Sequence, residues 1–301
     1  MKNFLKVFAD RFNDSSVNEL RNWDNDPVFS NFLSILNSVS DEQSFLNHYA
    51  EAMVAGYFKK LGCTLEVEVP NINNRKADIK VTKDNYSFFV HLKMLNLDKA
   101  SQKDSKITKR LQELRQIRKP VTFCALFHRS LSDKEMQELY KEAKHFIESS
   151  AVGSKMSFKN KCQIELLPGP IGKNVQLVLS MSVKCVDDRK RLYKRLSEAH
   201  KQFMSDAINI VLVTSNWKTD FEDFETALLG TTYEDYTVIP PKKGRENDGF
   251  WSSDKHHNSY IVGWFNFVRR IDSLNFRMFY RDNYQTPLFV KNLFKKTESV
   301  P

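Results

Sequence analysis

Apolar residues along the chain recur first at the spacing of an amphipathic helix and then at that of short strands. Residues 40–62 show the helical spacing, and Ser40 followed by Gln43 matches the box that caps a helix N-terminus. Gly62 is typical of a helix end, so we predict one helix over this segment. Three strands are then predicted, at residues 65–69, 77–81 and 86–95.

A second pattern, met twice, consists of a strand ending in lysine, a polar link, a basic helix and an apolar strand. It occurs as Lys93, a helix at 107–117 and a strand at 121–127, and again as Lys184, a helix at 192–203 and a strand at 208–214. Between the two copies we predict a helix at 133–147 and strands at 163–167 and 175–183. Strands alternating with helices indicate an α/β fold with a mixed sheet.

The sheet that begins at residue 65 can be completed in two ways, because either basic helix with its following strand can add to it. If the second does so, residues 101–180 are partly an elaboration of the core. We expect residues 1–40 to form an N-terminal helical segment packed on this core. Residues 41–301 are predicted to form a single elaborated domain, with a motif core at 41–127 and further helix–strand units at 131–301.

The C-terminal elaboration is expected to contain an acidic helix, a long polar loop and an apolar strand. These lie at residues 220–229, 240–258 and 260–267. The loop contains the sequence PPKKGRENDG and is the segment we expect to be most mobile.

Four polar side chains fall at unusual positions within this predicted core. Alternation along a strand places His91 and Lys93 on the face opposite Val90 and Leu92, and antiparallel pairing brings Asp78 of the preceding strand towards them. Glu51 shares a largely apolar row of the first helix, where a charge is costly unless it is used or paired. Carboxylates that hold a divalent ion beside an ammonium group suit phosphodiester hydrolysis.

This ordered set resembles the PD-(D/E)xK nuclease superfamily, which has the restriction-endonuclease-like fold of a mixed sheet flanked by helices. The resemblance rests on a helix glutamate, a strand aspartate 27 residues later and a short strand ending in x-Lys, and it covers residues 40–95. It implies that Asp78 and the next motif residue hold a metal ion, that Glu51 assists, and that Lys93 orients or activates the attacking water.

Two positions depart from the family pattern: Ala77 stands where proline is usual, and His91 stands where Glu, Asp or Gln is usual. Mg²⁺ prefers oxygen ligands, whereas an imidazole suits softer ions such as Mn²⁺. The expected metal ligands are Asp78, His91 and Glu51, with Mg²⁺ or Mn²⁺ as cofactor. His91 is either a substitute ligand or the mark of a degenerated site. A simple Asp78–Lys93 ion pair and a solvated Glu51 are the structural alternatives.

Charge favours an anionic partner, since Lys and Arg outnumber Asp and Glu by 46 to 37, for a net charge of +9. The basic helices are expected to contact phosphates through Lys109, Arg110, Arg189, Lys190 and Lys194, unless they are merely solvated. EAHKQF, residues 198–203, is similar to a helix of some family members in which a Gln or Lys reaches the active site, which adds Gln202.

The sequence therefore predicts a metal-dependent endo- or exonuclease that acts on DNA or RNA, with DNA favoured over RNA as the substrate. The alternatives are a catalytically degenerate nucleic-acid-binding or assembly protein and a scaffold for an acidic protein. Four scattered cysteines suggest neither a zinc site nor a disulfide framework. Neither a secretory signal nor a membrane-spanning run is evident, so we expect a cytoplasmic location; the oligomeric state, including a homodimer, is left open.

Overall fold

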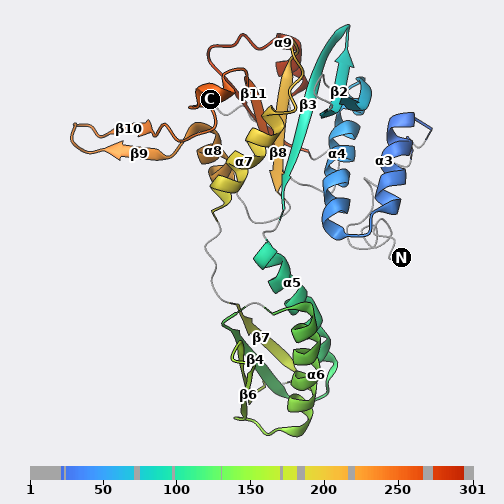
Figure 1. Cartoon of the computed structure of the whole chain (residues 1–301), viewed down its shortest axis with the longest axis vertical. Coiled ribbons are helices and arrows are strands. Elements are labelled where there is room, and N and C mark those ends of the chain that lie inside the picture. The colour runs from blue at the N-terminus through green and yellow to red at the C-terminus, as the bar shows by residue number, and fades with distance from the viewer. Residues whose placement is uncertain are drawn as a thin grey trace. The chain divides into compact units, whose positions relative to one another are not determined.

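The computed structural model describes residues 22–23, 25–70, 75–96, 99–129, 131–169, 172–181, 187–215, 221–266 and 274–294 (Figure 1). The chain forms two compact units, one made of residues 1–96 and 187–301 and the other of residues 97–186. The second unit is thus an insertion in the sequence of the first. The predicted motif core at 41–127 includes parts of both units, and residues 1–21 of the predicted N-terminal segment lie outside the described residues.

A six-stranded mixed sheet forms the centre of the first unit. Its strands, in spatial order, are β1 (Thr64–Pro70), β2 (Lys76–Lys83), β3 (Tyr86–Leu95), β8 (Asn209–Ser215), β11 (Ile261–Phe265) and β12 (Phe276–Tyr280). The pairs β3–β8 and β8–β11 are parallel, and the other three are antiparallel. The second basic helix and its strand therefore complete the sheet, which answers the question that the sequence left open.

Helices cover both faces of this sheet. One face packs on α3 (Pro27–Ser38), α4 (Glu42–Lys60) and α9 (Leu288–Leu293), and the other on α7 (Asp188–His200) and α8 (Phe221–Leu229). Alternation along β3 places Val90 and Leu92 in the α4 layer and aims His91 and Lys93 at the α7 side, as predicted. None of the helices in the described ranges is long and apolar enough to cross a membrane.

Helix α4 begins one residue later than predicted, because Asp41 rather than Ser40 caps it. The Asp41 carboxylate accepts hydrogen bonds from the backbone N–H groups of Gln43 and Ser44 at 3.1 and 2.9 Å. A carboxylate at this position satisfies unpaired amides and also interacts favourably with the helix dipole.

The second unit packs two helices on one face of a four-stranded sheet. Helices α5 (Lys99–Leu111) and α6 (Asp133–Ser149) cover strands in the order β5 (Lys155–Phe158), β6 (Cys162–Pro168), β4 (Val121–Phe127) and β7 (Gln176–Ser180). A 3₁₀ helix, Gln112–Gln116, follows α5. Cys162 is buried and Cys124 partly exposed here, Cys63 is buried in the first unit, and Cys185 and Lys184 lie outside the described residues.

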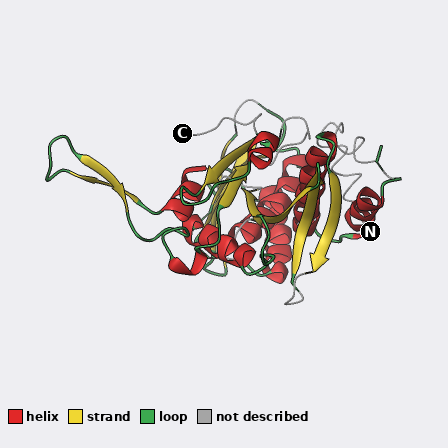
Figure 2. Ribbon diagram, turned by 90° about the horizontal axis from the view of Figure 1, so that it is seen from above, coloured by secondary structure: helices red, strands yellow, loops and turns green. Residues whose placement is uncertain are grey.

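The predicted polar loop at 240–258 is partly ordered into secondary structure. Strand β10 (Lys242–Arg245) pairs antiparallel with β9 (Thr232–Asp235), and a 3₁₀ turn, Asp254–His256, follows. The two strands make a ribbon that extends away from the sheet and helices of the first unit (Figure 2). The sequence KKGR lacks the apolar alternation by which strands are recognised, so this strand was missed.

Candidate functional site

Asp78 and Lys93 meet where β2 and β3 lie side by side. Oδ2 of Asp78 lies 3.5 Å from Nζ of Lys93, and the same oxygen accepts a hydrogen bond from the backbone N–H of Leu92 at 2.6 Å. The side chains keep 21% and 15% of their exposure, respectively, so the pair is screened from most solvent but remains accessible. The structure therefore brings together two of the four residues predicted for the site.

His91 lies beside this pair in sequence but is fully buried. Its Nε2 lies 2.9 Å from Oδ1 of Asn209, and its ring stacks on that of Phe203 with centroids 5.1 Å apart. The Asn209 amide donates to the carbonyls of Met204 and Ala207, which fixes Oδ1 as the acceptor and Nε2 as the protonated nitrogen of His91.

Burial leaves His91 a neutral imidazole. Loss of solvent around the ring lowers its pKa to about 4, against which the hydrogen bond with Asn209 acts only partly. Nδ1, the nitrogen without the proton, is buried and has no hydrogen-bond partner among the described residues. His91 thus joins β3 to the first residue of β8, through Asn209, and to the segment before β8, through Phe203.

Glu51 makes its contact within its own helix. Its Oε2 lies 3.1 Å from Nδ1 of His48, and this hydrogen bond raises the pKa of His48. Within the described ranges, no hydrogen bond or ion pair links Glu51 with Asp78, His91 or Lys93. The side chain retains 25% of its exposure, so pairing and partial solvation together satisfy its charge.

The predicted Mg²⁺ or Mn²⁺ site requires Asp78, His91 and Glu51 to converge. In the part of the chain that the structure describes, no three His, Cys, Asp or Glu side chains are grouped so as to hold a metal ion. Of the predicted ligands, Asp78 has an accessible carboxylate at the site, His91 is enclosed against Asn209 and Glu51 is paired with His48. These three side chains, as placed, do not fit a common metal ion.

A basic pocket of about 400 Å³ opens beside the Asp78–Lys93 pair. It is lined from the start of β2, from β3 and from the C-terminal end of α7 with its following turn. The lining side chains are Arg75, Lys76, Lys93, Arg195, Glu198, Lys201 and Gln202. Five of the seven are cationic and one is acidic, so the pocket suits an anion.

The pocket's walls are held together by contacts between α7 and the start of β2. Nη1 of Arg75 donates to the carbonyl of Lys201 at 2.9 Å, and Nε2 of Gln202 donates to the carbonyl of Lys76 at 3.1 Å. Gln202 therefore lines the pocket and is anchored to the backbone of β2, whereas the role that the family resemblance implies for it stays a prediction.

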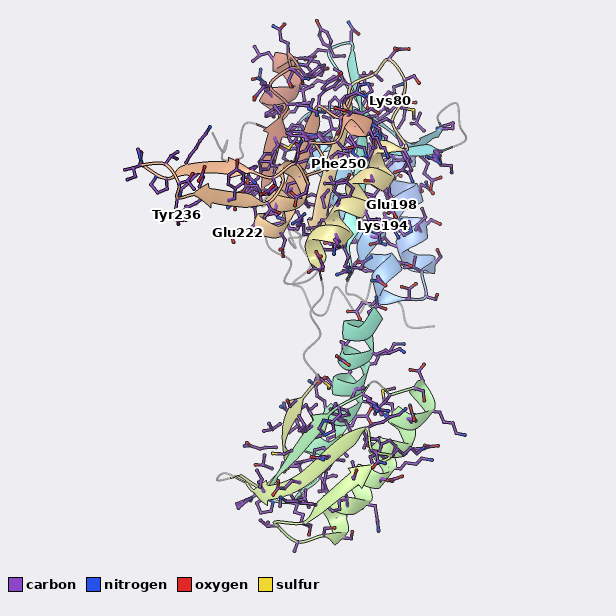
Figure 3. The ribbon with its side chains drawn as sticks, turned by 60° about the vertical axis from the view of Figure 1, so that its left-hand side comes forward. Lys80, Lys194, Glu198, Glu222, Tyr236 and Phe250 are labelled. Atoms are coloured by element: carbon purple, nitrogen blue, oxygen red, sulfur yellow. The ribbon has the colours of Figure 1, made fainter. Side chains whose placement is uncertain are left out.

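The other predicted nucleic-acid contacts fall at separate places. Arg110 binds the carboxylate of Glu113 and lies over the ring of Tyr140, and the exposed Lys109 precedes it in the second unit. On α7, Lys190 and Lys194 are exposed, and Figure 3 shows Lys194 on the same helix as Glu198.

Arg189 has an internal role in this structure. It donates to the Thr231 hydroxyl at 2.6 Å and pairs with the carboxylate of Asp248, linking α7 to the base of the β9–β10 ribbon. Its guanidinium is thereby engaged within the protein.

Five of the seven pocket residues were not among the site residues predicted from the sequence, namely Arg75, Lys76, Arg195, Glu198 and Lys201. Arg75 and Lys76 lie at the start of β2, shortly before Asp78. Two adjacent cations are visible in the sequence, but they indicate a pocket only once α7 is known to pack beside them. Lys201 lies beyond the last turn of α7, where only the packed structure shows which way the chain continues.

A larger cavity, of about 520 Å³, lies on the outer face of the four-stranded sheet in the second unit. Its lining is mostly apolar or neutral, and its one cation, Lys155, pairs with its one anion, Glu165, at 3.4 Å. Volume alone does not make a site, and the smaller basic pocket is the one that gathers charge beside the predicted chemistry.

Comparison with known proteins gives no match among protein-family models, curated proteins or solved structures. Functional inference therefore rests on the geometry of the basic pocket and its neighbours.

Proposed function

We propose that this protein binds nucleic acid, with a phosphate of the backbone held in the basic pocket beside Asp78 and Lys93. The observation that carries the proposal is the convergence of five cationic side chains from β2, β3 and α7 on one open pocket. Phosphate groups are bound by such clusters largely through charge and with little dependence on base sequence.

The cations of the pocket are available to a ligand in different degrees. Lys76 pairs with Glu68 at 2.5 Å and Arg195 with Glu198 at 2.8 Å, but these side chains are about half exposed, and such pairs contribute little and exchange readily. Lys201 is exposed, and no ion pair is present for it among the described residues. Its ammonium group is the one we expect to meet a phosphate first.

Similarity to the PD-(D/E)xK superfamily is part of this proposal. What supports this similarity is the position of Asp78 and Lys93 on neighbouring strands, with Gln202 reaching β2 from the turn that follows α7. Burial and neutrality of His91, in the place of an acidic ligand, favour the degenerate alternative, in which the fold binds nucleic acid without efficient hydrolysis.

Fluorescence anisotropy with labelled duplex DNA, single-stranded DNA and RNA, titrated over a range of KCl, tests the proposal. We expect binding whose affinity falls steeply as salt rises. Lys141→Ala, on the exposed face of α6, is a control that removes one positive charge elsewhere and should leave binding unchanged. Absence of salt-dependent binding to all three nucleic acids would refute the proposal.

Phosphodiester hydrolysis is the second candidate, favoured by the 3.5 Å approach of the Asp78 carboxylate to the Lys93 ammonium at the pocket wall. Incubation of plasmid, linear duplex, single-stranded DNA and RNA with Mg²⁺ or Mn²⁺ tests it. Cleavage that is lost in both Asp78→Asn and Lys93→Ala would establish hydrolysis. Retained binding without cleavage would leave the binding function alone, and His91→Glu would then be the variant in which to look for restored activity.

A further inference from the structure

The β9–β10 ribbon ends in an apolar tip. Asp235 pairs with Lys242 at the last rung, so residues 236–241, with the sequence YTVIPP, form the tip beyond the sheet. Ile239 is 97% exposed, Tyr236 73% and Val238 45%. Figure 3 shows Tyr236 far out on the ribbon. Several apolar side chains exposed together on a projection mark a surface that contacts something else.

The ribbon is fixed to the helix that lines the basic pocket. Arg189 of α7 binds Thr231 and Asp248 on the two sides of the ribbon's base. Arg245 adds a hydrogen bond to the carbonyl of Gly230 at 3.0 Å and an ion pair with Glu225 of α8 at 2.8 Å. The mounting is therefore made by four side-chain contacts rather than by the two connecting strands alone.

Two cross-strand contacts also stabilise the paired part of the ribbon. A side chain at Gly244 would meet the ring of Tyr233 on the opposite strand at 2.5 Å, so glycine is required for that ring to lie across the ribbon. Lys243 pairs with Glu234 across the strands at 3.0 Å. These two contacts support the paired strands from which the tip extends.

The size and shape of the tip suit duplex DNA, the partner in the proposed function, rather than a second copy of the chain. Lys242, directly after the apolar segment, is exposed and lies opposite Asp235 at the last rung, so the charges at the base of the tip balance. Six residues are too few to bury the roughly 800 Å² per partner of a typical stable interface. One aliphatic side chain and a proline are enough, however, to enter a groove and separate stacked bases.

We propose that the ribbon is a wedge that inserts Ile239, with the adjoining Pro240, into a base step of DNA bound at the basic pocket. The inference rests on the proposed function, because the pocket supplies the affinity that holds the duplex. Lys242 would contact the backbone beside the inserted residue, and Arg189 keeps the wedge aligned with α7.

Duplexes carrying 2-aminopurine at successive positions report base unstacking as a rise in fluorescence. We expect the parent protein, at saturating concentration verified by anisotropy, to raise the signal at one or two neighbouring positions. Ile239→Ser should abolish this rise and weaken binding by about tenfold, since one buried aliphatic side chain is lost. Leu288→Ser, which alters another exposed aliphatic residue of the same unit, is the matched control and should behave as the parent does.

The outcomes separate this inference from the function on which it rests. Salt-dependent binding without a fluorescence rise, or an equal rise with Ile239→Ser, would overturn the wedge and leave the binding function standing. Absence of binding by the parent would remove both. A dimer that becomes monomeric in Ile239→Ser by sedimentation velocity, with no unstacking, would show that the tip contacts a second copy instead. Because Ile239 is almost fully exposed, loss of folding is not expected to interfere, and circular dichroism checks this.

Discussion

The carboxylate of Asp78 accepts a hydrogen bond from the backbone N–H of Leu92 at 2.6 Å, so a side chain of β2 satisfies an amide of the neighbouring strand. The last registered pair of these strands is Ile79 with Val90, and Asp78 lies one residue beyond it. Asp78 thus has a structural role as well as its place beside Lys93. Loss of function on its removal has two explanations unless the variants are chosen to separate them.

Asp78→Ala should destabilise the protein more than Asp78→Asn does. Alanine leaves the Leu92 amide without its acceptor, at a cost of about 1–3 kcal/mol, whereas the asparagine oxygen still accepts the bond. Urea unfolding at pH 7 measures the difference. Equal stability of the two variants would show that the hydrogen bond contributes little, and Asp78→Asn is in any case the better variant for functional assays.

Stability should fall as pH decreases from about 6.5 to about 4, because His91 resists protonation in the folded state. Burial lowers the folded pKa to about 4 from the ordinary 6.5, so the unfolded chain binds the proton first, and the loss amounts to about 3 kcal/mol when complete. Neighbouring Asp78, Lys93 and His200 also act on this pKa.

Urea unfolding of the parent and of His91→Leu at pH 7.0, 5.5 and 4.5 tests this dependence. The leucine variant should lose less stability over the interval, although it starts lower because Asn209 loses a partner. His256, whose pKa burial also lowers, titrates in both proteins, so the difference between them isolates His91. Parallel curves would contradict the expectation.

Lys201→Ala should weaken binding to all nucleic-acid sequences alike. Removal of one phosphate contact lowers the slope of log affinity against log salt by about 1. Anisotropy titrations at several KCl concentrations measure both quantities, with Lys141→Ala as the charge-matched control. An unchanged slope would place the phosphate elsewhere.

Arg189→Ala should loosen the ribbon without reducing the salt dependence of binding. Its contacts with Thr231 and Asp248 are about one-third exposed, so we expect a loss of only about 0.2–1 kcal/mol in global stability. Hydrogen exchange should nevertheless become faster in residues 231–248. A lower salt slope in this variant would instead support the sequence-based prediction that Arg189 contacts phosphate.

Replacement of residues 97–186 by a short Gly–Ser linker should leave the first unit folded. The two units have separate hydrophobic cores, and the guanidinium of Arg191 on α7 donates to the carbonyl of Asn96, so the ends of the insertion lie close together. Circular dichroism and salt-dependent DNA binding test this expectation. An unfolded product would mean that the first unit depends on the insertion.

Much of the first unit follows from local sequence. The predicted bounds of the strand at 86–95 agree with the structure to the residue, because its alternation is regular and Asp84 and Asn85 are residue types typical of tight turns. In the structure both residues adopt positive φ values. Alternation also placed His91 and Lys93 on one face correctly. The short strands β5 and β12 were missed, because four or five residues give too brief a pattern.

The pocket could not be predicted, because it depends on contacts between distant segments. Arg75 and Lys201 meet only when α7 packs against β3 and its C-terminal turn reaches the start of β2. The environment of His91 is a similar case. Asn209 can form its hydrogen bond with Nε2 of His91 only because β8 pairs in parallel with β3. The pattern of a sequence indicates which face of a strand a residue occupies, whereas the residues that it contacts depend on the order of the strands in the sheet.

The insertion between β3 and β8 also sets an order of events during synthesis. His91 of β3 pairs with Val211 of β8, so β3 leaves the ribosome well before the strand with which it pairs on that side. At elongation rates of about 5–20 residues per second that interval is roughly 6–24 s, ample time for the inserted unit, which is contiguous in sequence, to fold first. Until β8 emerges, β3 is an edge strand whose backbone N–H and C=O groups are unpaired on one side, and such edges promote aggregation. Nascent chains that stall within the insertion are therefore the species on which chaperones should be found.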